Sequence, residues 1–119
     1  TNTGAVVTGI LTATTFAGRL ETVPTTNKTA SATAVKSDAG TLITTNSQFI
    51  IAQDVFGAGD IISIYNNSGS DIQISQGTNV TLRLVGGTTT GNRTLAQRGL
   101  ATVTCVAANE FVCSGGGLT

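Results

Sequence analysis

Three aspartates in predicted turns are the side chains of this chain that come closest to forming a metal site. Asp54, Asp60 and Asp71 lie in stretches rich in Gly, Asn and Ser, and carboxylate oxygens are the ligands that Ca²⁺ takes in protein loops. A dedicated calcium loop needs a dense alternation of acidic residues, which these widely separated aspartates lack. The spacing therefore favours aspartates that form turns, and we expect no metal and no cofactor.

The chain contains no histidine. A serine, threonine or cysteine nucleophile would therefore lack its usual general base. Glycine-rich stretches at residues 57–59 and 86–91 are not followed by the Lys-Ser or Lys-Thr and helix of a phosphate-binding loop. A Ser/Lys or paired-carboxylate site is not forbidden by the composition, but no such pair stands out. The sequence predicts a protein that is not an enzyme.

Two cysteines, Cys105 and Cys113, flank residues 108–110. If a hairpin turns at Asn109, the two lie directly opposite each other, close enough for a cross-strand disulfide in principle. The alternative is a pair of reduced, buried cysteines that pack as small apolar residues, which assembly in a reducing cytosol favours. Without a histidine, two sulfurs do not make a zinc site within one chain.

One aromatic side chain lies beside amides in a predicted turn. Tyr65, the single tyrosine, is followed by Asn66 and Asn67, and an aromatic ring beside amides can stack on a sugar and bond to it. Arg93, at the end of the loop at residues 88–93, would extend such a recognition surface. Ordinary packing of Tyr65 is the alternative.

The composition describes a weakly charged chain with a small core. Charged residues make up 10% of the 119 residues, formal net charge is zero and aromatic residues account for 4%, whereas an ordinary domain has about 25% charged residues. Such a surface does little to repel copies of itself, which suits assembly. Nucleic-acid binding is not expected, because it needs a basic patch. A membrane span is not expected either, because no apolar run approaches about 20 residues.

Short alternating segments recur through the last two thirds of the chain. In residues 61–66, Ile62 and Ile64 share one face while Ser63 and Tyr65 share the other, the period of a half-buried strand. Further strands are predicted at residues 41–45, 48–52, 71–76, 80–85, 93–95, 100–107 and 110–114. Strands at this spacing with turns between them predict an all-β fold, an antiparallel β-sandwich of jelly-roll type or a small barrel.

The first third of the chain has a different pattern. Residues 1–37 are rich in Thr, Gly and Ala, hold the only proline and show no clean periodicity, so they are predicted to form an extended N-terminal arm with one or two strands. The arm would gain order by packing on the domain at residues 38–119 or on another subunit. Ile10, Leu11 and Phe16 are the residues predicted to anchor it.

Residues 38–119 resemble a module of tailed-bacteriophage virion proteins of the marine or cyanophage type. The matching blocks are DAGTLI (38–43), GAGDIISIYNNS (57–68), QGTNVTLRL (76–84), TTGNRTLAQRGLAT (89–102) and FVCSGGGL (111–118). They follow one another in order and lie in about two thirds of the chain. The stretch GILTATTF at residues 9–16 is similar to repetitive Gly/Thr segments that precede such modules in fibre-like proteins. Cys113 departs from the pattern, which has an aliphatic residue in the closing strand.

The resemblance implies a β-sandwich on the virion exterior, commonly a homotrimer, that serves as head decoration, head fibre or tail fibre. The short chain favours an exterior capsid decoration or head-fibre protein, assembled in the host cytoplasm, whose arm docks on the major capsid protein or on a fibre base. One alternative is a tail-fibre module that binds a receptor or a host-surface glycan. Another is a filament subunit that donates residues 1–15 as a strand to the next copy.

Overall fold

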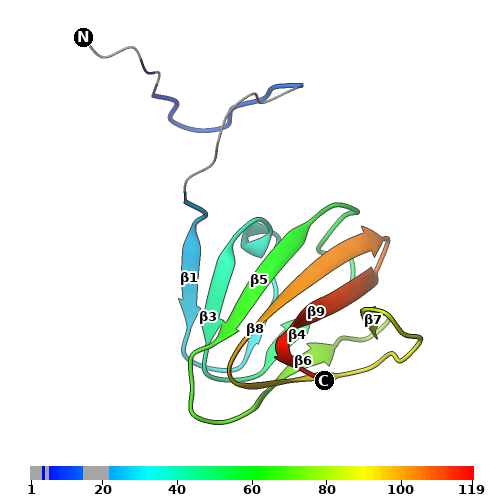
Figure 1. The fold of residues 1–119 in the computed structure, drawn as a ribbon. Helices are drawn as coiled ribbons and strands as arrows, with labels where there is room; N and C mark the ends of the chain where they lie inside the picture. The colour runs from blue at the N-terminus through cyan, green and yellow to red at the C-terminus, as the bar shows by residue number, and fades with distance from the viewer. Residues whose placement is uncertain (1–3, 5, 15–21) are drawn as a thin grey trace.

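The computed structural model describes residues 4, 6–14 and 22–119, and strands dominate the part after residue 22 (Figure 1). The strands are β1 (Thr25–Lys28), β2 (Ala32–Thr33), β3 (Leu42–Thr45), β4 (Phe49–Ile51), β5 (Ile61–Asn66), β6 (Ile72–Gln76), β7 (Thr81–Leu84), β8 (Arg93–Ala107) and β9 (Glu110–Leu118). A turn of 3-10 helix, η1 (Lys36–Asp38), lies between β2 and β3. In the described residues these nine strands form one sheet, which confirms the predicted all-β fold.

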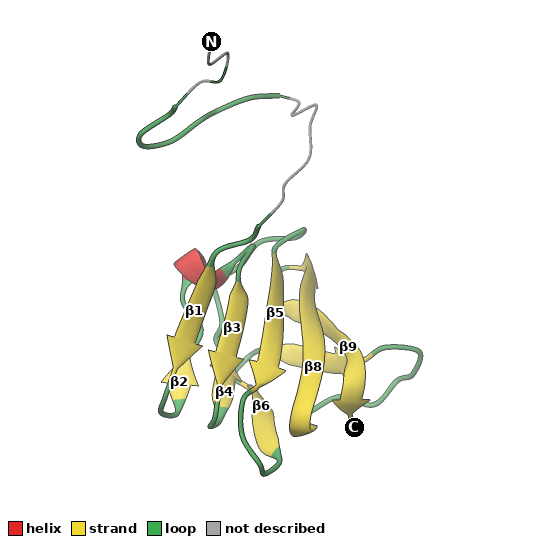
Figure 2. Ribbon diagram, turned by 60° about the vertical axis from the view of Figure 1, so that its left-hand side comes forward, coloured by secondary structure: helices red, strands yellow, loops and turns green. Residues whose placement is uncertain are grey.

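The first six strands form arches that stack on one another. β1, β3 and β5 pair in parallel with one another, and so do β2, β4 and β6. The arches β1–β2, β3–β4 and β5–β6 therefore each cross the core, with the first strand in one wall and the second strand in the other. Figure 2 shows β1, β3 and β5 side by side in one wall.

The long strand β8 joins the two walls. Its C-terminal half pairs with β5 and its N-terminal end pairs with β6, both antiparallel. β9 pairs antiparallel with β8 on its other side, and β7 adds in parallel to β9. The sheet thus curves into a nearly closed barrel, in which β1 and β2, the two ends of the strand order, are open edges (Figure 2).

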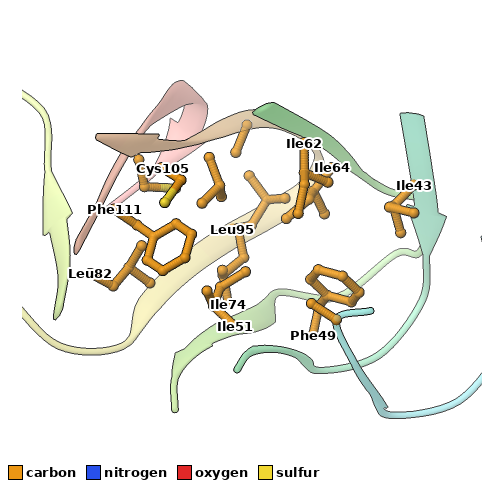
Figure 3. Packing of buried hydrophobic residues seen from close by; sticks show 14 of the residues in the cluster. Ile43, Phe49, Ile51, Ile62, Ile64, Ile74, Leu82, Leu95, Cys105 and Phe111 are labelled. Atoms are coloured by element: carbon orange, nitrogen blue, oxygen red, sulfur yellow. The ribbon is translucent and has the colours of Figure 1, made fainter. Parts of the chain in front are cut away.

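The core follows from the alternation within each strand. Ile62, Ile64 and Asn66 of β5 are buried, whereas Ser63 and Tyr65 between them are more exposed. The side chains that meet between the walls are mainly aliphatic (Figure 3), and the fully buried large ones include Ile43, Phe49, Ile51, Ile64, Ile74, Leu82, Leu95 and Phe111. Phe56 packs edge-on against Phe111, with ring centroids 6.0 Å apart. Few aromatic residues are thus enough to fill this thin core.

The strand pairing differs from the predicted antiparallel sandwich. Among the described strands, only the pairs that involve β8 are antiparallel. The turns after β3 and β5 carry the chain across the core to the opposite wall instead of back along the same wall. An alternation of period two is common to both arrangements, so the sequence pattern does not distinguish them.

The sheet also begins earlier than residue 38. β1 and β2 lie within the residues assigned to the arm, where one or two strands were expected, and they pair with β3 and β4. Ala34 contributes to the core with 2% exposure. Residues 25–37 therefore form part of the barrel, and the arm that lies clear of it ends before β1.

Candidate functional site

The N-terminal arm exposes apolar side chains that were predicted to anchor it. Ile10 is 92% exposed and Leu11 is 64% exposed, and Val6 beside them is 93% exposed. This described part of the arm extends away from the barrel (Figures 1 and 2). Phe16, the third predicted anchor, lies outside the described residues. The arm thus presents apolar surface that a partner could cover.

The four residues predicted to form a recognition surface separate into two groups. Tyr65 is half-buried and Asn67 is exposed, but Asn66 is 0% exposed and Arg93 is 7% exposed. The expectation that Asn66 and Arg93 lie on the surface is therefore wrong, since both side chains point inward and bond to the backbone.

Asn66 holds the turn of the β5–β6 arch against β8. Its Nδ2 donates to the carbonyl oxygens of Ser70 at 2.7 Å, Leu95 at 3.1 Å and Ala96 at 2.9 Å. Its Oδ1 accepts a hydrogen bond from Ser68 Oγ at 2.7 Å. Both the nitrogen and the oxygen of this buried amide therefore have hydrogen-bond partners, and the amide links the β5–β6 turn to β8.

Arg93 supports the loop that precedes β8. Its Nε donates to the carbonyl oxygens of Gly91 at 3.2 Å and Asn92 at 2.9 Å, and its Nη2 lies 3.4 Å from the carbonyl oxygen of Thr90. The guanidinium group therefore forms its hydrogen bonds within its own loop, so Arg93 has a structural role.

Tyr65 and Asn67 lie on the outer face of the wall formed by β3, β5 and β8. Tyr65 is aligned with Thr44 on one side and with the exposed Leu100 on the other. Asn67 accepts a hydrogen bond from Arg98 Nη1 at 2.8 Å through its Oδ1. An aromatic ring, an amide and a guanidinium group therefore share this face, and these groups can stack on a ligand and form hydrogen bonds to it.

Asp54 and Asp71, two of the predicted aspartates, form hydrogen bonds to residues that lie far away in the sequence. Asp54 and Asn109 form a reciprocal pair in which Asp54 N–H donates to Asn109 Oδ1 at 2.8 Å and Asn109 Nδ2 donates to Asp54 Oδ1 at 2.9 Å. Asp71 Oδ1 accepts the Gln97 N–H at 3.2 Å. No group of three acidic, histidine or cysteine side chains gathers in the part of the chain that the structure describes.

Asp60, in the turn before β5, forms an ion pair with Lys36 of η1. Its Oδ2 accepts hydrogen bonds from Lys36 Nζ and from Gly57 N–H. The hydrogen bond from Lys36, followed by that from Gly57, lowers the pKa of the Asp60 carboxyl. The pair connects η1 to the turn before β5.

Cys105 and Cys113 are both buried and free. The register aligns Cys105 with Phe111 and Val103 with Cys113, and an irregularity follows Cys105. The expectation that the two cysteines lie directly opposite is therefore wrong, since the hairpin turns at residues 108–109, not symmetrically about Asn109. Burial raises the pKa of the Cys113 thiol to about 12 and also raises the pKa of Cys105.

Scans against protein-family models, curated proteins and solved structures each found no match. In the described residues, no helix is long and apolar enough to span a membrane. What this chain binds has to be argued from its own surfaces.

Sequence reasoning expected one or two strands within residues 1–37, but it missed their place at the edge of the barrel and the ion pair beside them. Lys28 of β1 extends its Nζ to Asp38 Oδ2 at 3.1 Å and lies 5.6 Å from the centre of the Phe49 ring. Asp38 also accepts the Val35 N–H at 2.9 Å. The polar run TTNK gives little sign of a strand, and the one hint is the lysine itself, since lysine is common on edge strands.

Proposed function

We propose that this chain is a non-enzymatic structural protein of a phage virion exterior, a capsid decoration or head-fibre protein that assembles as a homotrimer. The observation that carries the proposal is the exposed apolar arm. Val6 and Ile10 are each more than nine-tenths exposed, beside a barrel that has its own core. Exposed apolar side chains gain free energy when a partner covers them, at about 25 cal/mol per Å².

The low charge of the surface supports an assembly function. With six acidic and six basic side chains in 119 residues, copies of this chain meet little electrostatic repulsion. In this proposal copies assemble through the barrel and the N-terminal arm, and the partner on the virion is the major capsid protein or a fibre base. The attachment to a phage particle rests on the resemblance of residues 38–119 to virion modules.

Immunogold electron microscopy tests this proposal directly. Antibodies raised against the purified chain are applied to particles of a phage that encodes it. We expect regular labelling at the particle surface. Label that stays with free protein, while the particles are bare, would contradict the proposal.

A glycan-binding tail-fibre module is the second proposal, and the face around Tyr65 favours it. Tyr65, Leu100 and the hydrogen-bonded pair of Asn67 and Arg98 provide both a stacking surface and polar groups. Glycan-array binding that is lost in Tyr65→Ala and kept in Tyr65→Phe would support stacking by the ring. Equal binding by the wild type and Tyr65→Ala would exclude this face as the site.

A further inference from the structure

The arch β1–β2 ends the parallel stack with an unpaired edge. Among the described residues no strand pairs with the outer side of β1 or β2. Ala32 and Ala34 donate their N–H groups to the carbonyl oxygens of Gln48 at 3.1 Å and Ile50 at 2.8 Å. Because alternate residues of a strand direct their backbone groups to opposite sides, the N–H of Thr33 faces the open edge. Such an edge is a template for another strand.

At two inward positions the side chains of this edge arch are smaller than those of the arch beneath it. Thr26 is aligned with Ile43, and Ala32 is aligned with Phe49. Thr26 is exposed and Ala32 is half-buried, whereas Ile43 and Phe49 are fully buried. The stack therefore ends on small side chains at these two positions, on which larger ones can pack. Lys28, which is aligned with Thr45, lies between them and bonds to Asp38.

The arm repeats the residue pattern of the β3–β4 arch. In that arch Ile43, Thr45 and Phe49 point into the core and are each 0% exposed, and Thr45 Oγ1 bonds to the backbone of Ser47 at the turn. The arm carries the same three residue types at the same spacing, as Ile10, Thr12 and Phe16. Aligned on this pattern, Ile10 corresponds to Thr26 of the edge arch and Phe16 corresponds to Ala32.

We infer that residues 10–16 of a second copy form a further arch on the open β1–β2 edge, with Ile10 packed on Thr26 and Phe16 packed on Ala32. The occupant is a second copy because the described part of the chain's own arm extends away from this edge (Figures 1 and 2). The inference rests on the proposed function, in which copies assemble through the arm. It adds the receiving edge, the register and the residues that face inward.

The inferred arch separates two neighbouring apolar residues of the arm. Ile10 takes the place of Ile43 and faces the core, whereas Leu11 takes the place of Thr44, which lies on the outer face beside Tyr65. Both Ile10 and Leu11 are exposed in the structure. Leu11→Asn is therefore a matched control for Ile10→Asn, since an unspecific apolar contact would not distinguish the two.

The test combines native mass and amide exchange on the full chain. Light scattering over a wide concentration range measures association of the wild type, Ile10→Asn, Phe16→Ser and Leu11→Asn. Amide exchange by NMR follows the N–H of Thr33, with the N–H of Ala34 as an internal control, since Ala34 already donates to Ile50. We expect association to slow exchange at Thr33, and Ile10→Asn or Phe16→Ser to raise the dissociation constant about tenfold or more. Leu11→Asn should associate like the wild type.

Three results would overturn the inference. The first is that Ile10→Asn and Leu11→Asn weaken association equally. The second is that association leaves amide exchange at Thr33 unchanged. The third is that the wild type remains a monomer over the whole concentration range. Slow exchange at Thr33 in a chain that stays monomeric would assign the edge to the chain's own arm and exclude the second copy. Immunogold labelling of particles tests the proposed function separately from this interface. If particles are labelled but the Thr33 N–H exchanges as fast in the associated protein as in the monomer, this interface alone would be rejected.

Discussion

Lys28 and Asp38 form an ion pair that closes the end of the core beneath the edge strand β1, with Nζ and Oδ2 3.1 Å apart. Asp38 is almost fully buried, with 3% of its side chain exposed, and Lys28 retains 16%. Lys28 is aligned with the buried Thr45, so its side chain points inward from β1. Here it also places an aliphatic stem and an ammonium group over the ring of Phe49.

Replacement of Lys28 by alanine should destabilise the barrel. The substitution leaves the buried Asp38 carboxylate without its cation and uncovers Phe49, so we expect the free energy of unfolding to fall by about 1–3 kcal/mol. Urea denaturation followed by circular dichroism measures this change. Lys36→Ala is the control, because the side chains of the Lys36–Asp60 pair are 66% and 25% exposed, and it should cost less. Equal losses would show that the burial of Asp38 adds nothing.

Asn66→Ala should be among the more harmful polar substitutions in the chain. It removes the donor to the carbonyl oxygens of Ser70, Leu95 and Ala96, and buried groups left without a partner cost about 1–3 kcal/mol. We expect a loss of that size or more in the free energy of unfolding. Asn67→Ala next to it removes an exposed hydrogen bond and should change stability by about 0.5 kcal/mol or less. Thermal unfolding gives the melting temperature of each variant. Similar melting temperatures for Asn66→Ala and Asn67→Ala would refute the structural role assigned to the Asn66 hydrogen bonds.

Alkaline pH should destabilise the protein through Cys113. Its pKa is about 12 in the folded state, against an ordinary value of 9.0. The raised pKa means that the thiol contributes its full stabilisation below pH 9 and loses it as the pH rises toward 12. Urea titrations at several pH values between 8 and 11 should show stability declining faster in the wild type than in Cys113→Ala. Parallel pH profiles would contradict this prediction.

Acid should weaken the contact between η1 and the turn before β5. The pKa of Asp60 is lowered from its ordinary value of 3.8, first by the hydrogen bond from Lys36. The stabilisation is therefore complete above that value and is lost as the pH falls through the lower, folded-state pKa. Lys36→Ala and Asp60→Asn should each flatten the acid limb of the stability profile, and the double variant should flatten it no further. An additive effect in the double variant would show that the two residues act independently.

Local strand positions were predictable from the sequence, and their pairing was not. The alternation around Ile62 and Ile64 predicted residues 61–66, which are the bounds of β5. Residues 93–95 and 100–107 were predicted as separate strands, whereas β8 runs through both. Pairing depends on whether a turn continues along one wall or crosses the core, and turn residues such as Asn and Ser occur in both cases.

Surface residues were harder to predict than strands. Asn66 and Asn67 have the same side chain and are neighbours in one turn, yet Asn66 is buried and Asn67 is exposed. The difference arises because the β5–β6 turn lies against β8, a contact between residues far apart in the sequence. Arg93 is also buried, because its guanidinium group bonds to backbone carbonyls of the loop that precedes it.

The closure of both walls by β8 and β9 has a consequence for synthesis on the ribosome. The stacked arches up to Gln76 can pair with one another, but β5 and β6 obtain their antiparallel partner only from residues 93–107. In a growing chain one edge each of β5 and β6 therefore stays unpaired until residues 93–107 emerge, and such long-range closure is intrinsically slow. Nascent copies on neighbouring ribosomes would meet while these strands are still accessible, so the rate of translation can influence how many copies pair correctly.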